Sequence, residues 1–366
     1  MKTTAAVLRS ADQPYSIETI ELPDIADDEV LVRIVSAGIC HTDSILRNAA
    51  AMLLPIIPGH EGAGVVEAVG AGVTSISPGD HVVLSFDSCG HCRNCADHLN
   101  PYCDQFAMKN FVGSKLDGSP PATDLDGKAV ASRWFGQSSF ATYAIASEQN
   151  TVVVDSDADL RLLGPLGCGI QTGAGSVLIA LDVQPGESIA VYGTGGVGMA
   201  AIMAARVAEA ATIIAVDRHQ HRLDLAVELG ATHTVLAADG VDVAGAVVAA
   251  SGGGTDYAFD TTGVPAVVTA AVAGLRATGV CGLVGAGGDQ LVFDPNALFG
   301  KTVVGIFEGN ADPQQFIPRM IELWQDGRFP FDRLIETYAL SQIDEAEQAS
   351  LDGSVIKPVL LPELVL

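Results

Sequence analysis

The segment Gly193-Thr-Gly195-Gly-Val-Gly198 decides the fold of this chain. A short apolar run, 188–192, stands directly before it, and the run 199–208 after it has helical character. The next apolar run, 213–216, ends at Asp217. A short buried strand, a glycine turn, a helix and a second strand make a βαβ unit. We therefore expect a parallel sheet with crossover helices in this half of the chain.

The glycine spacing and the acid that follows it indicate a dinucleotide site. In the pattern G-x-G-x-x-G, the first glycine makes a tight turn, the second lets the backbone approach a pyrophosphate, and the third packs helix against strand. The N-terminus of the helix then supplies N–H groups and partial positive charge to the phosphates. Asp217 lies nineteen residues after Gly198 and is placed to accept hydrogen bonds from an adenosine ribose. The alternative is an ordinary surface acid at a strand end.

The pattern of predicted secondary structure changes near residue 173. Before it, short strand-like runs such as 30–35 and 81–84 alternate with glycine and proline turns, which suggests a barrel-like or irregular β domain. After it, helical and strand-like runs alternate through 222–229, 234–236, 257–260 and 280–284. The last fifty residues are mixed again, with helix-like runs at 313–324 and 343–351.

Length and charge exclude several classes of protein. A chain of 366 residues suits two domains, each with its own core. With 19 Lys+Arg against 44 Asp+Glu, the formal charge is −25, so we expect neither nucleic acid nor an anionic membrane surface as a partner. No apolar run reaches the roughly 18 residues that span a bilayer. The start, Met1 to Ala5, lacks the apolar stretch of a signal peptide, and we expect a cytoplasmic protein.

Four of the seven cysteines lie within fifteen residues, at Cys89, Cys92, Cys95 and Cys103. In a reducing compartment, clustered cysteines indicate metal or catalysis rather than disulfides. Four thiolates at this spacing can surround one Zn²⁺ tetrahedrally and leave no open position. The segment 88–103 has little apolar periodicity and cannot be stabilised by core burial, so a bound metal is a reasonable source of its stability. The alternatives are a chance cluster of buried thiols, or ligation by His91 or His98.

Three further residues have chemistry but no informative spacing: Cys40, His60 and Cys168. Cys40 begins the segment Cys-His-Thr-Asp, His60 lies in Gly-His-Glu-Gly, and Cys168 stands between two glycines. Because they are far apart in the sequence, spacing alone does not pair them, and each taken singly suggests a structural residue.

The sequence as a whole resembles the zinc-dependent medium-chain alcohol dehydrogenases. The matching pieces follow one another in family order along nearly the whole chain: Cys40 to Asp43, Gly59 to Gly64, the four-cysteine lobe, Gly167 to Gly169, and the glycine motif with Asp217. Within the family, the segments 110–111, 117–119 and 135–143 look most like the aryl-alcohol (benzyl alcohol) dehydrogenase branch. Allylic terpene alcohol dehydrogenases share much of that pattern.

The resemblance implies an α/β protein with two domains. Residues 1–170 and 309–366 would form a GroES-like, β-rich catalytic domain that carries the structural zinc lobe at 88–103. Residues 171–308 would form an inserted Rossmann domain with a doubly wound parallel sheet. Family members are homodimers or homotetramers, so we expect one of these states.

The resemblance also implies two zinc ions per subunit. Cys40, His60 and Cys168 would bind the catalytic zinc, with a fourth position open to substrate, and the four clustered cysteines would bind the structural one. Asp43 would orient His60, and Glu61 would lie behind the metal as an occasional ligand. Thr42 would accept the alcohol proton, against the alternative of a turn hydroxyl that bonds its own backbone. Ile45 departs from the family, because many members have a relay histidine there.

The implied cofactor is NAD. His41 would touch the pyrophosphate, Arg222 would lie beside the adenosine ribose, and Lys357 would contact a phosphate. The implied set of cofactor-binding residues is His41, Thr172, Gly193, Gly195, Gly196, Val197, Gly198, Asp217, Arg222 and Lys357. Cys281 has no family role, and we expect it in the core.

The implied activity is the interconversion of primary aromatic or allylic alcohols and their aldehydes, which are small-molecule substrates. Trp134 and Phe135 would lie beside the substrate channel and favour such alcohols over ethanol, unless both rings are simply core. One alternative is an S-hydroxymethylglutathione (formaldehyde) dehydrogenase, but residues 105–108 lack the arginine of that branch. The other is a catalytically inactive dinucleotide-binding protein.

Overall fold

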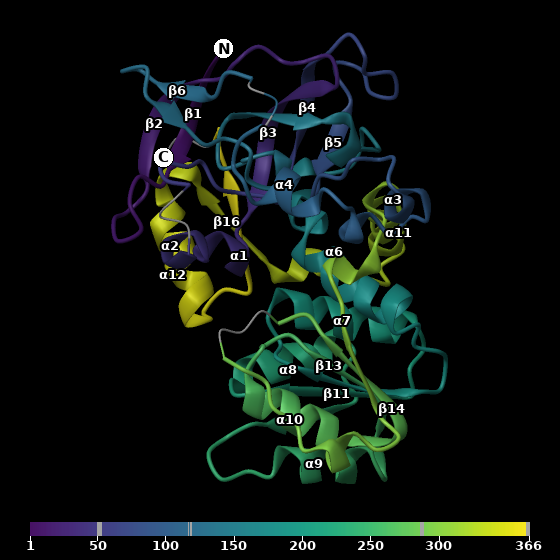
Figure 1. Cartoon of the computed structure of the whole chain (residues 1–366). Coiled ribbons are helices and arrows are strands. Elements are labelled where there is room, and N and C mark those ends of the chain that lie inside the picture. The colour runs from purple at the N-terminus through teal and green to yellow at the C-terminus, as the bar shows by residue number, and fades with distance from the viewer. Residues whose placement is uncertain (50–52, 116, 118, 286–288, 364–366) are drawn as a thin grey trace. The chain divides into compact units, whose positions relative to one another are not determined.

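The structure, a computed structural model, describes residues 1–49, 53–115, 117, 119–285 and 289–363 (Figure 1). They divide into two units, and each has its own hydrophobic core. The first unit comprises Met1–Cys168, Asp312–Arg319 and Asp332–Leu366. The second comprises Gly169–Ala311 and Met320–Phe331.

The second unit is built on a six-stranded parallel sheet with the order β12-β11-β10-β13-β14-β15. Its strands are β10 (Ser188–Tyr192), β11 (Thr212–Asp217), β12 (His233–Leu236), β13 (Thr255–Asp260), β14 (Leu275–Leu283) and β15 (Thr302–Gly305). The chain starts at the centre of the sheet, builds outward to one edge and then returns to build the other half. This strand order is that of dinucleotide-binding doubly wound folds, so the predicted parallel sheet is confirmed.

Helices cover both faces of this sheet. Helices α7 (Gly196–Val207) and α8 (Gln220–Leu229) pack together on one face, and α9 (Val243–Ser251) and α10 (Pro265–Ala273) on the other (Figure 1). Because both faces are covered, the central strand β10 is apolar and almost wholly buried. The unit also contains α6 (Gly169–Gly175), a π-helical turn (Ser176–Ala180) and short 3-10 turns at Pro295–Leu298 and Glu308–Asn310.

The first unit contains two sheets of short strands. The larger is mixed, with the order β16-β17-β3-β4-β5-β9 and with β8 paired to β3. Its strands are β3 (Glu29–Gly38), β4 (Gly62–Val69), β5 (His81–Leu84), β8 (Tyr143–Ser147), β9 (Thr151–Val154), β16 (Ile335–Ala339) and β17 (Lys357–Leu361). The smaller joins β1 (Lys2–Val7), β2 (Ser16–Glu21), β6 (Ala122–Asp124) and β7 (Ala129–Val130). The β-rich character predicted for this part of the chain is confirmed.

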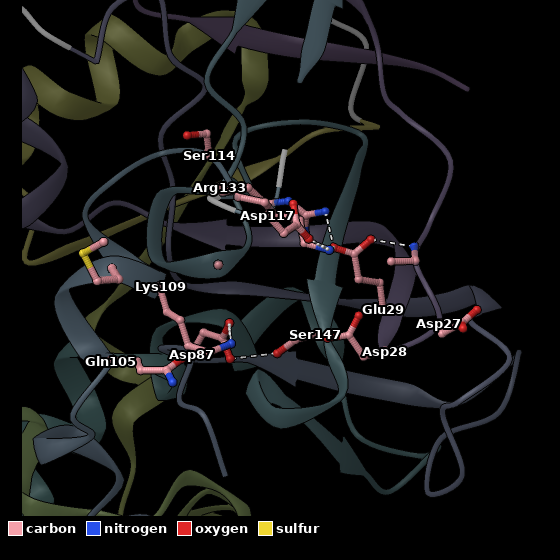
Figure 2. Close-up of a pocket in the computed structure, with 14 residues that line it drawn as sticks. Asp27, Asp28, Glu29, Asp87, Gln105, Lys109, Ser114, Asp117, Arg133 and Ser147 are labelled. Carbon is pink, nitrogen blue, oxygen red and sulfur yellow. Dashed lines mark hydrogen bonds and ion pairs between the residues drawn. The ribbon is translucent and has the colours of Figure 1, made fainter. Parts of the chain in front are cut away.

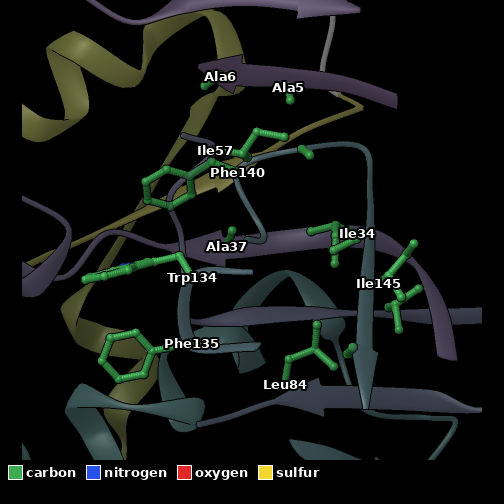
Figure 3. Close-up of a cluster of buried hydrophobic side chains, with 14 of the residues drawn as sticks. Ala5, Ala6, Ile34, Ala37, Ile57, Leu84, Trp134, Phe135, Phe140 and Ile145 are labelled. Carbon is green, nitrogen blue, oxygen red and sulfur yellow. The ribbon is translucent and has the colours of Figure 1, made fainter. Parts of the chain in front are cut away.

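Short helices connect these strands and carry several of the polar residues discussed below. They are α1 (His41–Ser44), α2 (Leu46–Ala49), α3 (Arg93–Ala96), α4 (Phe106–Asn110), α5 (Leu160–Leu163) and α12 (Ile343–Asp352). Helix α11 (Pro313–Gln325) contributes residues to both units. The core of the first unit includes two adjacent aromatic residues, Trp134 and Phe135, which are only 5% and 3% exposed (Figure 3).

Within the described ranges, no single helix is long and apolar enough to cross a membrane. The bent pair Leu160–Gly167 and Gly169–Ala180 passes that test only when the two helices are taken together, and only on length and composition.

Candidate functional site

The four clustered cysteines meet at one point of the first unit. Their sulfur atoms all lie within 4.8 Å of one another. Backbone N–H groups donate to the sulfurs: that of Cys92 to Cys89 Sγ (3.3 Å), and those of Cys89 and Gln105 to Cys103 Sγ (3.2 and 3.4 Å). Backbone N–H groups of Asp104 and Cys95 lower the pKa of Cys92 to about 6. A set of four sulfurs that is supplied with N–H donors fits a closed tetrahedral zinc site.

The two histidines of this segment point elsewhere. His91 Nδ1 lies 2.7 Å from the carbonyl oxygen of Cys89, and His98 Nδ1 lies 2.7 Å from Asp312 Oδ2. Neither imidazole belongs to the four-sulfur group.

A second group joins residues that the sequence keeps far apart. The ligand atoms of Cys40, His60, Glu61 and Cys168 all lie within 4.8 Å of one another. Cys40 precedes α1 at the end of β3, His60 lies just before β4, and Cys168 follows the 3-10 turn Gly164–Gly167. The strands of the larger sheet therefore bring together three chain segments that sequence spacing could not pair.

His60 has the environment of a metal ligand. Its Nδ1 lies 2.8 Å from Asp43 Oδ1, and both side chains are buried. Its Nε2 is buried and, among the described residues, makes no hydrogen bond. A histidine whose one nitrogen donates to a carboxylate and whose other nitrogen faces a pair of thiols has the donor arrangement that zinc requires.

The charges around this group favour thiolate ligands. A hydrogen bond from Cys168 and the nearby charge of the Lys357 ammonium lower the pKa of Cys40, which lies well below its usual value. Thr42, in α1, lies beside that ligand, with its Oγ1 3.7 Å from Cys40 Sγ. His41 and Ile45 are both exposed. A hydroxyl next to the metal group can exchange a proton with a bound alcohol.

Lys357, which the resemblance assigns to a phosphate contact, forms an ion pair in this structure. Its ammonium donates to both carboxylate oxygens of Glu61 (3.0 and 2.9 Å) and to the carbonyl of Ile39 (3.2 Å). Burial by itself would lower the pKa of Lys357, but the Glu61 carboxylate outweighs it and raises that pKa. The side chain is nearly buried, with 4% of the residue exposed, and this placement favours a buried ion pair behind the metal group over a phosphate contact.

The glycine motif connects β10 to α7 in the second unit. Gly193 has φ +88°, which suits glycine in a tight turn. A Cβ on Gly198 would lie 1.8 Å from the carbonyl oxygen of Gly193, so helix and strand can meet only without one. A Cβ on Gly195 would meet nothing within 4 Å, and α7 begins at Gly196. The backbone therefore leaves open space at a helix N-terminus, which fits the pyrophosphate of a dinucleotide.

Asp217 ends β11 and faces this motif. Its Oδ2 accepts the N–H and the hydroxyl of Thr194 (both 2.8 Å), and its Oδ1 accepts the N–H of His219 (2.9 Å). Burial would raise the pKa of Asp217, but these hydrogen bonds and the charge of Arg222 outweigh it and lower the pKa. Oδ1 keeps a lone pair for a further hydroxyl donor.

Sequence reasoning missed Glu308, which lies in the same unit. This buried acid accepts a hydrogen bond from Thr172 Oγ1 (3.1 Å), a predicted cofactor contact. Its φ is +47°, a left-handed conformation that non-glycine residues seldom adopt and that often marks functional positions. A lone glutamate outside any recognisable motif gives no signal in the sequence, so only the fold brings it to Thr172.

Aromatic rings lie directly against the second group. The ring of Phe135 stacks on the imidazole of His60, with centroids 4.4 Å apart and an interplanar angle of 23°. Phe111 contacts the rings of Phe135 and Trp134, at centroid distances of 5.3 and 6.0 Å. Phe111 is 38% exposed, whereas Trp134 and Phe135 are buried. Phe111, which the sequence marks only as part of the segment 110–111, is thus the accessible member of the cluster.

A pocket of about 750 Å³ lies elsewhere in the first unit (Figure 2). Several of its charged side chains form ion pairs with one another: Glu29 pairs with Lys115 and Arg133, and Asp87 pairs with Lys109. None of the predicted site residues lines it.

Comparisons with known proteins agree with this geometry. Residues 26–156 match the model of the alcohol dehydrogenase GroES-like domain, and residues 196–326 match that of the zinc-binding dehydrogenases. The chain is 45% identical to geraniol dehydrogenase of Castellaniella defragrans over 98% of its length and 97% of that protein. It is 38% identical to the NDMA-dependent alcohol dehydrogenase of Amycolatopsis methanolica, with 99% of each chain covered.

Solved structures are similar over the whole chain. The benzyl alcohol dehydrogenase of Acinetobacter calcoaceticus superimposes with a TM-score of 0.94 at 41% identity and covers 99% of both chains. An alcohol dehydrogenase zinc-binding domain protein of Burkholderia ambifaria gives 0.96 at 49% identity, covering 99% of this chain and 100% of its own.

The chain therefore belongs to the zinc-dependent medium-chain alcohol dehydrogenase family. It is an oxidoreductase that acts on alcohols and uses zinc and NAD. The family, the fold, the enzyme class and the cofactors predicted from the sequence are confirmed.

Proposed function

We propose that this enzyme interconverts primary aromatic or allylic alcohols and the corresponding aldehydes. The observation that carries the proposal is the aromatic cluster packed on a metal-ligand candidate: Phe135 stacks on His60, and Phe111 extends the cluster to an exposed position. Planar substrates gain from ring contacts and from burial of apolar area there, whereas ethanol does not. The relatives named for geraniol and benzyl alcohol support the same substrate class.

We propose that Cys40, His60 and Cys168 hold the catalytic zinc and that the four-cysteine group holds the structural zinc. The donor sets support this assignment, since one group is closed by four sulfurs and the other has only three strong ligands besides Glu61. Asp43 keeps the His60 ring in place, and the Lys357 ammonium compensates the charge of Glu61.

When bound, zinc favours loss of the alcohol proton, and NAD accepts the hydride. Thr42 would receive that proton at its Oγ1, because its hydroxyl lies beside the ligand Cys40. Ile45 cannot continue a relay, since its side chain has no titratable group. Thr42 would then pass the proton on toward solvent without help from the side chain at position 45.

The cofactor contacts are assigned in the same way. The glycine motif, with Gly196 and Val197 in the first helical turn, would bind the pyrophosphate. Asp217 would accept ribose hydroxyls, with Arg222 beside it, and His41 would contact the pyrophosphate. Thr172 would also contact the cofactor. The first unit would be the catalytic domain, predicted as 1–170 and 309–366, and the second the cofactor domain, predicted as 171–308. The structure differs from these bounds chiefly at 309–311 and 320–331, which belong to the second unit.

We propose a homodimer or homotetramer in the cytoplasm. The strand β15 ends the parallel sheet, and the strongly exposed Val292 and Phe299 come shortly before it, which supports a docking edge for a second copy. A free, clustered set of cysteines supports a reducing compartment. Light scattering should give two or four times the 37.7 kDa subunit mass.

The test is a steady-state panel of benzyl alcohol, cinnamyl alcohol, geraniol, ethanol and S-hydroxymethylglutathione with NAD⁺ and NADP⁺. The proposal predicts the highest kcat/KM for the first three alcohols with NAD⁺. A preference for S-hydroxymethylglutathione would replace it with the formaldehyde dehydrogenase alternative. No turnover of any alcohol would indicate a protein that only binds the dinucleotide.

A further inference from the structure

Trp134 donates a hydrogen bond to the carboxylate that holds His60. Its Nε1 lies 3.1 Å from Asp43 Oδ1, the same oxygen that lies 2.8 Å from His60 Nδ1. Both Trp134 and Asp43 are buried. A buried indole N–H needs an acceptor, and this one is met by the partner of a metal-ligand candidate rather than by a backbone carbonyl.

Among the described residues, the hydrogen-bond donors to Asp43 come from the metal group and its surroundings. Besides His60 and Trp134, the N–H of Gly59 donates to Oδ1 (3.1 Å) and the N–H of Cys40 donates to Oδ2 (3.2 Å). The carboxylate is therefore fixed from the two backbone segments that carry Cys40 and His60. The indole supplies the one side-chain donor besides His60 itself among the described residues.

The next residue along the chain fixes the imidazole itself. Phe135 stacks on the His60 ring, so two consecutive side chains hold the ring and its carboxylate. This placement requires φ +50° at Phe135, a left-handed conformation that is unfavourable for an aromatic residue. The chain accepts local strain in order to place both side chains.

The turn that carries these two residues is anchored at both ends. The Arg133 guanidinium donates to Glu29 (2.6 Å) and to the carbonyl of Ile145 (2.7 Å), at the wall of the charged pocket (Figure 2). Ser138 Oγ accepts the N–H of Trp134 (2.9 Å). The indole is thus attached to the scaffold of the first unit independently of any metal.

We propose that Trp134 is a positioning residue for the catalytic zinc, acting through Asp43 on His60. The inference rests on the proposed function, in which His60 is a zinc ligand. The hydrogen bond preorganises Asp43, and Asp43 holds the imidazole with Nε2 directed to the metal position. Outer partners of this kind typically contribute 10–100-fold to metal affinity. An interaction one step further out belongs at the lower end of that range.

The test compares Trp134→Phe, which keeps an aromatic ring but removes the N–H, with Trp324→Phe, the same change at the chain's other tryptophan. Holoenzyme is exposed to a chelator, and zinc release is followed by metal analysis. We expect Trp134→Phe to release one of the two zinc ions about tenfold faster than the wild type, with the other unchanged, and Trp324→Phe to release both at wild-type rates. The d–d absorption bands of the cobalt-substituted Trp134→Phe enzyme should shift. Wild-type release rates together with an unshifted cobalt spectrum would overturn the inference.

Two further measurements distinguish the positioning role of Trp134 from the proposal that His60 is a zinc ligand. In the Trp324→Phe variant, Trp134 is the sole tryptophan, and its emission should change when the labile zinc is removed and recover when zinc is returned. If the emission of Trp134 is the same with and without the labile zinc, the positioning role would be overturned. His60→Ala should bind one zinc instead of two. If it kept two, the proposed function would fail, whatever Trp134→Phe does.

Discussion

The two metal-ligand groups of the first unit are assembled in opposite ways. The four-cysteine group comes from one segment of fifteen residues, whereas Cys40, His60 and Cys168 come from three segments spread over 129 residues. The first comes from a segment with little apolar periodicity whose cysteines lie at the edge of the core of the first unit, and we expect its metal to hold that segment together. The second is held by sheet strands and by a carboxylate that accepts hydrogen bonds from both backbone segments around it. A local group of ligands therefore depends on its metal for structure, and a group assembled by the fold depends on the fold.

We expect the largest effect on activity when a ligand is removed from the assembled group, Cys40, His60 and Cys168. Cys40→Ser or His60→Ala should lower kcat by at least about a thousandfold, because metal assistance contributes several kcal/mol to the reaction. The melting temperature should change little, since the strands around the group remain. Metal analysis should find one zinc per subunit. Cys281→Ala, at a buried cysteine outside both groups, is the matched control and should keep two. A ligand variant that unfolds would show that this metal also holds the fold.

Removing a ligand from the local group should have the reverse effect. Cys95→Ser should cost on the order of 5 kcal/mol of unfolding free energy, because metal binding there contributes directly to folding. The surviving folded fraction should still turn over alcohol at a rate near that of the wild type. Chemical unfolding and activity at low temperature measure the two quantities separately. If the folded fraction of Cys95→Ser loses activity as well as stability, the distinction between the two groups would be removed.

The buried ion pair behind the assembled group offers a third test. Lys357→Met would leave Glu61 buried without its ammonium partner, which costs about 3–5 kcal/mol of stability. The control is Lys115→Met, because Glu29 would keep Arg133, and that loss should stay below about 1 kcal/mol. If Lys357 instead contacts a phosphate of the cofactor, Lys357→Met should raise the KM for NAD⁺ and leave the unfolding free energy unchanged.

The same contrast explains how much could be predicted from the sequence. The glycine motif, Asp217 and the four cysteines are local patterns, and each was recognisable because its chemistry depends on short spacing. The partners Lys357–Glu61, Trp134–Asp43 and Thr172–Glu308 are separated by 296, 91 and 136 residues, and no periodicity connects them. Two strands of the smaller sheet of the first unit could not be predicted for a related reason. Strand β7 has two residues and its partner β6 has three, too few to show an alternating pattern.

The smallest effect that we predict concerns the accessible ring beside the assembled group. Phe111 contacts the rings of Trp134 and Phe135 and is not itself a candidate ligand, so truncating it should spare the metal. Phe111→Ala should lower kcat/KM for benzyl alcohol and geraniol about tenfold, since a lost ring contact and lost apolar burial together amount to roughly 1–2 kcal/mol. For ethanol the loss should stay within about twofold, because a two-carbon substrate cannot reach the same surface.

The control for Phe111→Ala is Leu125→Ala, which truncates another exposed apolar side chain of the first unit and should leave both substrates unaffected. Zinc content and melting temperature, measured on both variants, show whether the metal group is intact. An equal loss on ethanol and benzyl alcohol, with both zinc ions present, would mean that Phe111 supports the turn of Trp134 and Phe135 and does not contact substrate. In that case the aromatic cluster belongs to the scaffold of the metal group, and the substrate preference must come from residues outside it.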